Sequence, residues 1–94
     1  MNQGVSTRAV SGALTFDTVP NLYKESAAWF EGTGDLTLDL AQVTTTDSAG
    51  LALLVEWLRR ARDARLGLRF INIPAQAQTL MRINNLQDAF NQNP

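Results

Sequence analysis

The chain has 94 residues, a formal net charge of −1 and a hydrophobic fraction of 45%. These values predict one globular domain, residues 1–94, and give no reason to expect a nucleic acid partner. With no cysteine and no histidine, the chain has no disulfide and lacks the commonest general base and metal ligand. We expect neither metal nor cofactor.

Nothing in the sequence predicts a membrane or secretory segment. No apolar run reaches the roughly 20 residues that a membrane span needs. The first four residues have neither the charge nor the apolar core of a secretory signal. We therefore expect a cytoplasmic domain without direct membrane insertion.

The first part of the chain predicts a strand, a helix and a second strand. Residues 5–15 are poor in charge and contain β-branched side chains, which indicates a strand or a hairpin-like pair broken near Gly12. Residues 21–31 place apolar side chains on one helical face. Leucines at positions 36, 38 and 40 then alternate with polar residues, which predicts a strand with one apolar face.

The clearest predicted element is a helix that begins in the run Asp47-Ser48-Ala49-Gly50 and ends before Gly67. Its core-facing stripe consists of residues at i, i+3, i+4 and i+7, namely Leu51, Leu54, Val55 and Leu58. Residues 68–73 predict another strand, which Pro74 ends. Residues 76–84 predict a third helix, followed by a short terminal piece. Strands alternating with helices indicate an α/β layer with helices packed on a small sheet.

Two segments of the sequence resemble the STAS family, the domain of sulfate transporters and anti-sigma-factor antagonists. The first runs from Leu38-Asp39-Leu40 through Val43 to Asp47-Ser48-Ala49-Gly50-Leu51. The second joins the strand that ends at Pro74 to the spacing of Leu80, Ile83 and Leu86. The resemblance implies a STAS-like (SpoIIAA-like) fold, a small mixed sheet of about four strands with helices packed on it. It also implies that the first strand of many such domains is missing or very short here.

Within this family the chain is most similar to the small cytoplasmic STAS subunit of the ABC transporter that moves phospholipids and maintains outer-membrane lipid asymmetry. The run Gly50-Leu-Ala-Leu-Leu54 and the Asn85-Leu86 ending carry this narrower resemblance. It implies a non-catalytic accessory subunit that binds and stabilises or regulates the transporter ATPase, and that meets the membrane subunits only indirectly. Such a protein lies at the periphery of the inner membrane. The alternative is an anti-sigma-factor antagonist switched by phosphorylation of Ser48.

The predicted partner-binding site lies where the second predicted strand passes into the second predicted helix. A helix N-terminus presents unpaired N–H groups and a positive dipole end. Ser48 either caps the helix, lies on a docking surface or is a candidate phosphoacceptor. Asp47 suits the helix dipole, and Gly50 permits close backbone approach to a strand or a partner. The predicted set is Thr45, Thr46, Asp47, Ser48, Ala49, Gly50, Leu53 and Trp57, of which the threonines are expected in a solvated loop.

Leu53 and Trp57 fall off the apolar stripe of this helix at about 100° per residue. Either a neighbouring helix covers them, or they form an exposed anchor patch, since Trp is enriched in binding hot spots. In the second case Trp57→Ala weakens partner binding and leaves the domain folded.

The sequence does not support catalysis. No pair among its nine carboxylates lies in a general acid–base motif, and Ser48 has no histidine to activate it. Asp39 is expected to be structural, and Lys24 is the only lysine. The arginines at 59, 60, 62, 65 and 69 could indicate phosphate or membrane binding, but a solvated, dipole-matched helix end explains them with fewer assumptions. The sequence therefore predicts a protein-binding module.

Overall fold

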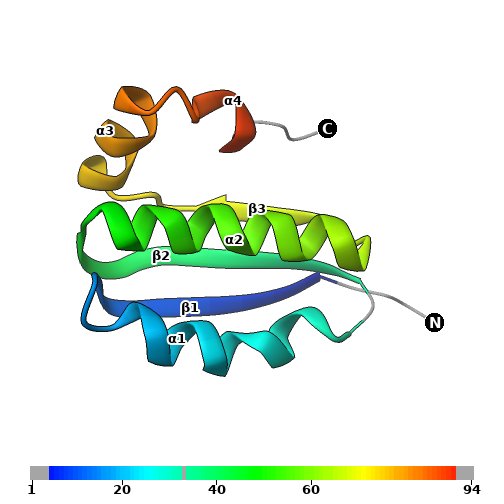
Figure 1. The fold of residues 1–94 in the computed structure, drawn as a ribbon. Helices are drawn as coiled ribbons and strands as arrows, with labels where there is room; N and C mark the ends of the chain where they lie inside the picture. Colours follow the sequence, from blue (N-terminus) through cyan, green and yellow to red (C-terminus); the bar gives the residue numbers. More distant parts are fainter. Residues whose placement is uncertain (1–4, 33, 91–94) are drawn as a thin grey trace.

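The computed structural model describes residues 5–32 and 34–90. Strands and helices alternate along the chain, which confirms the predicted α/β layer (Figure 1). In chain order the elements are β1 (Val5–Leu14), α1 (Val19–Glu25), the 3-10 helix η1 (Ser26–Phe30), β2 (Asp35–Thr46), α2 (Ser48–Ala64), β3 (Leu68–Ile71), α3 (Ala75–Ile83) and α4 (Gln87–Phe90).

The sheet has the order β1-β2-β3, and both pairs of neighbouring strands are parallel. Over the described ranges it is thus a three-stranded parallel sheet, whereas a mixed sheet of about four strands was expected. Residues 5–14 form one strand and not a hairpin. Gly12 has a φ of 85°, and the pairing with β2 shifts register on either side of Ser11 and Gly12. This irregularity is a β-bulge, and β1 continues in the same direction beyond it.

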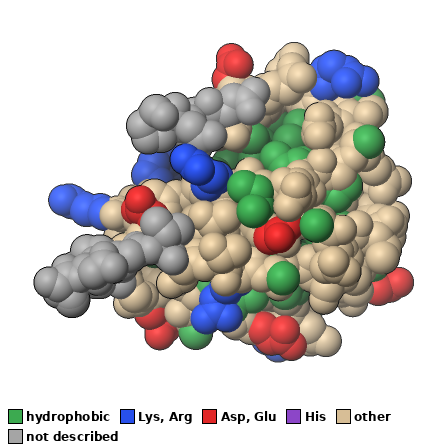
Figure 2. All heavy atoms as spheres, turned by 180° about the vertical axis from the view of Figure 1, so that it is seen from behind, with side chains coloured by type: hydrophobic (Ala, Val, Ile, Leu, Met, Phe, Trp, Pro, Cys, Tyr) green, Lys and Arg blue, Asp and Glu red, His purple; other side chains and the backbone are tan. Residues whose placement is uncertain are grey.

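The helices pack on one face of this sheet (Figure 1). Leu36, Leu38 and Leu40 of β2 alternate toward that face and are at most 3% exposed. The opposite face carries exposed or half-exposed side chains, among them Thr7, Thr37 and Arg69. Seen from behind, where this face lies, polar side chains and backbone cover much of the surface (Figure 2). The hydrophobic core therefore lies on one side of the sheet only.

Helix α2 is buried on two sides, because the sheet lies beneath it and α1 and η1 lie beside it. Trp57 is fully buried and Leu53 is 2% exposed. The Trp57 indole packs against Trp29 of η1 with 5.4 Å between ring centroids. The prediction of an exposed anchor patch is therefore wrong. The alternative prediction, that a neighbouring helix covers Leu53 and Trp57, is confirmed. In the predicted stripe Leu51 and Leu54 are buried, while Val55 and Leu58 are half-buried.

The remaining helices differ from expectation mainly at their ends. The predicted helix over residues 21–31 is divided into α1 and η1. Pro74 precedes α3, which begins one residue earlier than predicted. Among the helices of residues 5–32 and 34–90, none combines the length and the apolar composition that a membrane span requires.

Candidate docking site at the N-terminus of α2

The carboxyl ends of the three parallel strands meet at one edge of the sheet, at the left in Figure 1. The connections to α1, α2 and α3 therefore lie close together. The backbone N–H of Asp47 donates to the carbonyl oxygen of Leu14 at 3.1 Å. The N–H of Thr46 donates to Oε1 of Gln76 at the start of α3, at 2.8 Å. These bonds tie the start of α2 to both neighbouring connections.

Asp47 is the N-cap of α2. Its Oδ1 accepts hydrogen bonds from the N–H groups of Ala49 and Gly50 at 2.9 and 3.1 Å. Its Oδ2 accepts from the N–H of Phe16 in the β1–α1 connection, at 3.0 Å. The bonds from Phe16 and then Gly50 hold the pKa of the Asp47 carboxyl below its ordinary value, because they stabilise the charged form. The expected interaction of Asp47 with the helix start is confirmed.

Ser48 is the first residue of α2 and is exposed. Because Asp47 occupies the capping position, the interpretation of Ser48 as the helix cap is wrong. Ser48 is instead an exposed residue that directly follows Asp47 in the chain.

Gly50 is buried in the first turn of α2, where it meets the end of β1. A Cβ built on Gly50 would lie 2.8 Å from Cβ of Leu14 and closer still to the Leu14 carbonyl oxygen. Real side chains do not tolerate such distances. Gly50 was expected to permit close approach either to a strand or to a partner. In the structure it permits the close approach of α2 to the strand β1.

The threonines before Asp47 belong to β2 and do not form the expected solvated loop. Thr46 pairs with Leu14 of β1 and is 2% exposed. Its Oγ1 is buried without a hydrogen-bond partner in the ranges that the model describes. Thr45 is exposed, and its Oγ1 donates to Oε1 of Gln76 at 3.1 Å. Thr45, and not Thr46, is therefore available on the surface beside Ser48.

Two exposed aromatic residues near this site were not predicted. Phe16 is 78% exposed and Tyr23 is 40% exposed. A groove of about 480 Å³ runs between α1 and α2, lined by Val19, Tyr23, Ala49, Ala52, Leu53, Glu56 and Arg59. Phe16 lies in the connection between β1 and α1 and belongs to no periodic pattern, so its exposure could not be predicted from the sequence.

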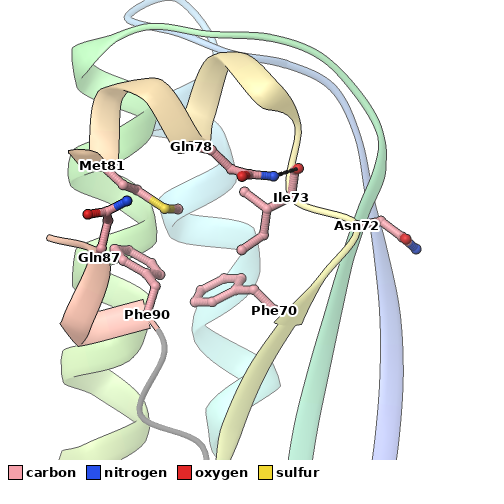
Figure 3. Close-up of a pocket in the computed structure, with 7 residues that line it drawn as sticks. All are labelled: Phe70, Asn72, Ile73, Gln78, Met81, Gln87 and Phe90. Carbon is pink, nitrogen blue, oxygen red and sulfur yellow. Dashed lines mark hydrogen bonds between the residues drawn. The ribbon is translucent and has the colours of Figure 1, made fainter. Parts of the chain in front are cut away.

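A second groove, of about 410 Å³, lies beside the edge strand β3 (Figure 3). The rings of Phe70 and Phe90 face each other there, with centroids 5.3 Å apart. Nε2 of Gln78 donates to the carbonyl oxygen of Ile73 at 2.9 Å. The lining of this second groove contains apolar and amide side chains but no ionisable one. The groove therefore offers a packing surface and no acid–base chemistry.

Asn72 points away from this second groove in Figure 3. Its Nδ2 donates to Oδ1 of Asp39 at 3.0 Å, and the N–H of Ala41 donates to the same oxygen at 2.9 Å. The hydrogen bond from Asn72, and to a smaller extent the one from Ala41, lowers the pKa of Asp39. Asp39 is thus structural, as predicted. Within residues 5–32 and 34–90, no group of three acidic side chains is placed to hold a metal ion.

Comparisons with known proteins agree with this architecture. The family model described as MlaB, STAS domain, matches residues 3–90. The crystal structure of a sulfate transporter family protein from Wolinella succinogenes is similar, with a TM-score of 0.74 and 15% sequence identity. The match covers 92% of this chain and 70% of that one. At this identity the likeness shows the fold alone, and no curated protein matches the sequence.

The family match spans β1 to α4, and the similar structure has the STAS fold that the sequence predicted. The motif residues Asp47, Ser48 and Gly50 lie together at the start of α2, as the resemblance implied. This chain belongs to the STAS domain family, in its MlaB group.

Proposed function

We propose that this chain is a non-catalytic accessory subunit of a phospholipid-transporting ABC system. It binds the cytoplasmic, MlaF-like ATPase subunit and stabilises or regulates it. The observation that carries the proposal is the exposed Ser48 at the first position of α2, in a chain of the MlaB group. Contact with the membrane subunits is indirect, so the protein lies at the periphery of the inner membrane through its partner.

The surface that would meet the ATPase is small and held rigidly. Thr45, Ser48 and part of Ala49 are accessible, while Asp47 anchors the helix start through three N–H groups. Thr46 and Gly50 support this surface from the interior. A rigid surface loses little conformational entropy on binding, so a few hydroxyl and apolar contacts suffice for a specific interface.

The alternative, a signalling module switched by phosphorylation of Ser48, is less well supported by this geometry. A phosphate at a helix N-terminus is favoured by free N–H groups. Here the carboxylate of Asp47 already accepts from the N–H groups of Ala49 and Gly50. A phosphate on the adjacent Ser48 would face like-charge repulsion, which favours the docking role.

The proposal is tested by titrating the purified transporter ATPase with the wild-type chain, Ser48→Ala and Ser48→Glu. We expect Ser48→Glu to weaken binding at least tenfold, about 1.4 kcal/mol, because it places a second bulky anion beside Asp47. Ser48→Ala should have a smaller effect. Thr79→Glu is the matched control, since Thr79 is an exposed hydroxyl residue of α3, and it should bind as the wild type does.

Copurification separates the two candidate functions. The tagged chain should recover the transporter ATPase from native membranes, with Ser48 unmodified. Recovery of a protein kinase without the ATPase, together with release of that kinase on phosphorylation of Ser48, would replace the proposal by the signalling alternative. Unchanged ATPase affinity of Ser48→Glu would remove Ser48 from the interface.

A further inference from the structure

We infer that the groove between α1 and α2, extended by Phe16, receives an amphipathic helix of the partner. The apolar side of that helix packs on the groove near Ser48, and a carboxylate farther along it meets Arg59. This inference rests on the proposed function, because it assigns a second, elongated contact to the same ATPase. We call Phe16 and the residues that line this groove the groove surface.

The groove surface is elongated and can accommodate a helix. Ala49, Ala52, Glu56 and Arg59 line it from α2 at spacings of three and four residues, so they form one stripe on that helix. From position 49 to position 59 this stripe is ~15 Å long, at about 1.5 Å per residue. Opposite it, Val19 and Tyr23 are four residues apart on α1. The groove therefore follows the axis of α2 for nearly three turns.

The end of the groove near Ser48 is apolar and accessible. Ala52 is exposed, Ala49 and Val19 are half-buried, and the buried Leu53 lies beneath them. The small alanine side chains allow another backbone to approach closely. The residues at this end lie on two helices. The N–H groups of Ala49 and Val19 are already bonded to Asp47 and Thr15, so the groove does not offer the free strand edge that an extended peptide requires.

The backbone of Phe16 lies close to the start of α2, near this apolar end. Its backbone N–H is bonded to the Asp47 carboxylate at 3.0 Å, which fixes Phe16 beside the start of α2. Its side chain is 78% exposed, although an aromatic ring gains from removal from water. An exposed aromatic residue held next to Ser48 is suited to serve as an anchor for the partner.

The far end of the groove carries charged side chains of both signs, Glu56 and Arg59. Glu56 lies 3.6 Å from Arg59 and 3.9 Å from Arg60, so one carboxylate faces two guanidinium groups. Arg60 stacks over the Tyr23 ring at 4.1 Å, whereas the side chain of Arg59 is 63% exposed. A guanidinium group can bind more than one acceptor. Charge complementarity therefore selects a partner helix with Asp or Glu opposite Arg59.

The first test adds a bulky side chain to the groove surface in one variant and replaces an apolar side chain by a polar one in another. The purified transporter ATPase is titrated with Ala52→Trp and Phe16→Ser. Ala64→Trp is the control for the first, because Ala64 is also an exposed alanine of α2, and Ile83→Ser is the control for the second, because Ile83 is 68% exposed. We expect each test variant to lose at least fivefold in affinity and each control to bind as the wild type does, with unchanged circular dichroism in all four.

Cross-linking and charge reversal identify the occupant. A photoreactive benzoylphenylalanine at position 52 should cross-link to a helix of the ATPase that carries an acidic residue. Arg59→Glu should weaken binding about tenfold, whereas the control Arg62→Glu, one turn farther along α2 and exposed, should not. Changing the acidic residue of the cross-linked helix to Arg should restore the affinity of Arg59→Glu.

The outcomes separate this inference from the proposed function. If Ser48→Glu abolishes binding while Ala52→Trp, Phe16→Ser and Arg59→Glu bind normally, the ATPase docks at Ser48 alone and the groove inference is wrong. Cross-linking from position 52 to a second copy of this chain, or to a non-helical segment, also overturns it. Failure of the wild-type chain to bind the ATPase overturns both proposals.

Discussion

The side chain of Trp57 joins two parts of the core through its polar atom. Its Nε1 donates a hydrogen bond to Oγ of Ser26 at 2.8 Å, and this hydroxyl donates to the carbonyl oxygen of Tyr23 at 3.1 Å. Both Trp57 and Ser26 are fully buried. A buried indole N–H without an acceptor would be costly, so the serine fixes the position of η1 against α2.

We expect Ser26→Ala to lower the free energy of unfolding by about 1–3 kcal/mol, because it leaves the Trp57 N–H buried and unpaired. Urea denaturation followed by circular dichroism measures the loss. Ser11→Ala, at an exposed position of β1, should change stability by less than about 0.5 kcal/mol. Equal stability of the two variants would show that the Ser26–Trp57 bond contributes little.

The burial of Trp57 also shows which properties of single residues cannot be predicted from the sequence. A helical stripe identifies the face that packs on a sheet, and Leu51 and Leu54 were identified correctly in this way. It does not reveal a second neighbouring helix. The cover over Leu53 and Trp57 comes from residues about 30 positions earlier in sequence, in α1 and η1. Whether Phe16 is exposed depends on the same long-range packing.

At the scale of elements, the crossing of α2 over the end of β1 positions the candidate site. The first turn of α2 approaches Leu14 so closely that position 50 must lack a side chain. The N–H of Asp47 donates to the carbonyl oxygen of the same leucine at 3.1 Å. This close approach brings Ser48 to the edge of the sheet where the connections to the helices gather.

Gly50→Ala should destabilise the fold although alanine is the better helix former by about 1 kcal/mol. The new methyl group would collide with the backbone of Leu14, and overpacking of this kind typically costs about 1–3 kcal/mol or more. Thermal unfolding compared with that of Ser48→Ala, an exposed change two residues earlier, isolates the effect. A Gly50→Ala variant as stable as the wild type would mean that β1 and α2 can move apart without cost.

The elements themselves were largely predictable from local patterns. The start of α2 and the apolar face of β2 follow from cap residues and alternation. The predicted end of the third strand at Pro74 is wrong, because β3 ends at Ile71, just before Asn72 with its φ of 56°. The direction and number of the strands do not follow from local patterns. Parallel pairing joins residues about 30 positions apart, such as Leu36 with Leu68, and it extends β2 through the threonines that were expected in a loop. Residues 1–4, in which an earlier strand would begin, lie outside the described residues.

At the scale of the whole molecule, two carboxylates bind separate parts of the structure together. Asp47 links the β1–α1 connection to α2, and Asp39 links β2 to Asn72, which follows β3. Both have a pKa below the ordinary 3.8 of an aspartate, because hydrogen bonds stabilise their charged forms. Both are thus better stabilised when charged in the folded chain than in the unfolded one.

The stability of the molecule should therefore depend on pH in the acidic range. A carboxyl whose pKa is lower in the folded chain contributes its full stability above its unfolded pKa, and this contribution is lost as the pH falls through the folded pKa. We expect the urea midpoint to fall as the pH drops from about 5 to below 3.8. Asp47→Asn, which retains a good helix cap, should flatten this dependence, as should Asp39→Asn. A midpoint of the double variant that varies with pH as in the wild type would assign acid sensitivity to other groups.

The pairing of the two tryptophans makes the chain its own optical reporter. Trp29 and Trp57 are the only indoles in the sequence, and their rings pack against each other between η1 and α2 with a tilt of 39°. Trp57 is nine residues beyond Ser48, ~14 Å along the helix. Intrinsic fluorescence thus records whether η1 remains packed on α2, and a substitution on the outer surface that leaves the emission spectrum unaltered has left that packing intact.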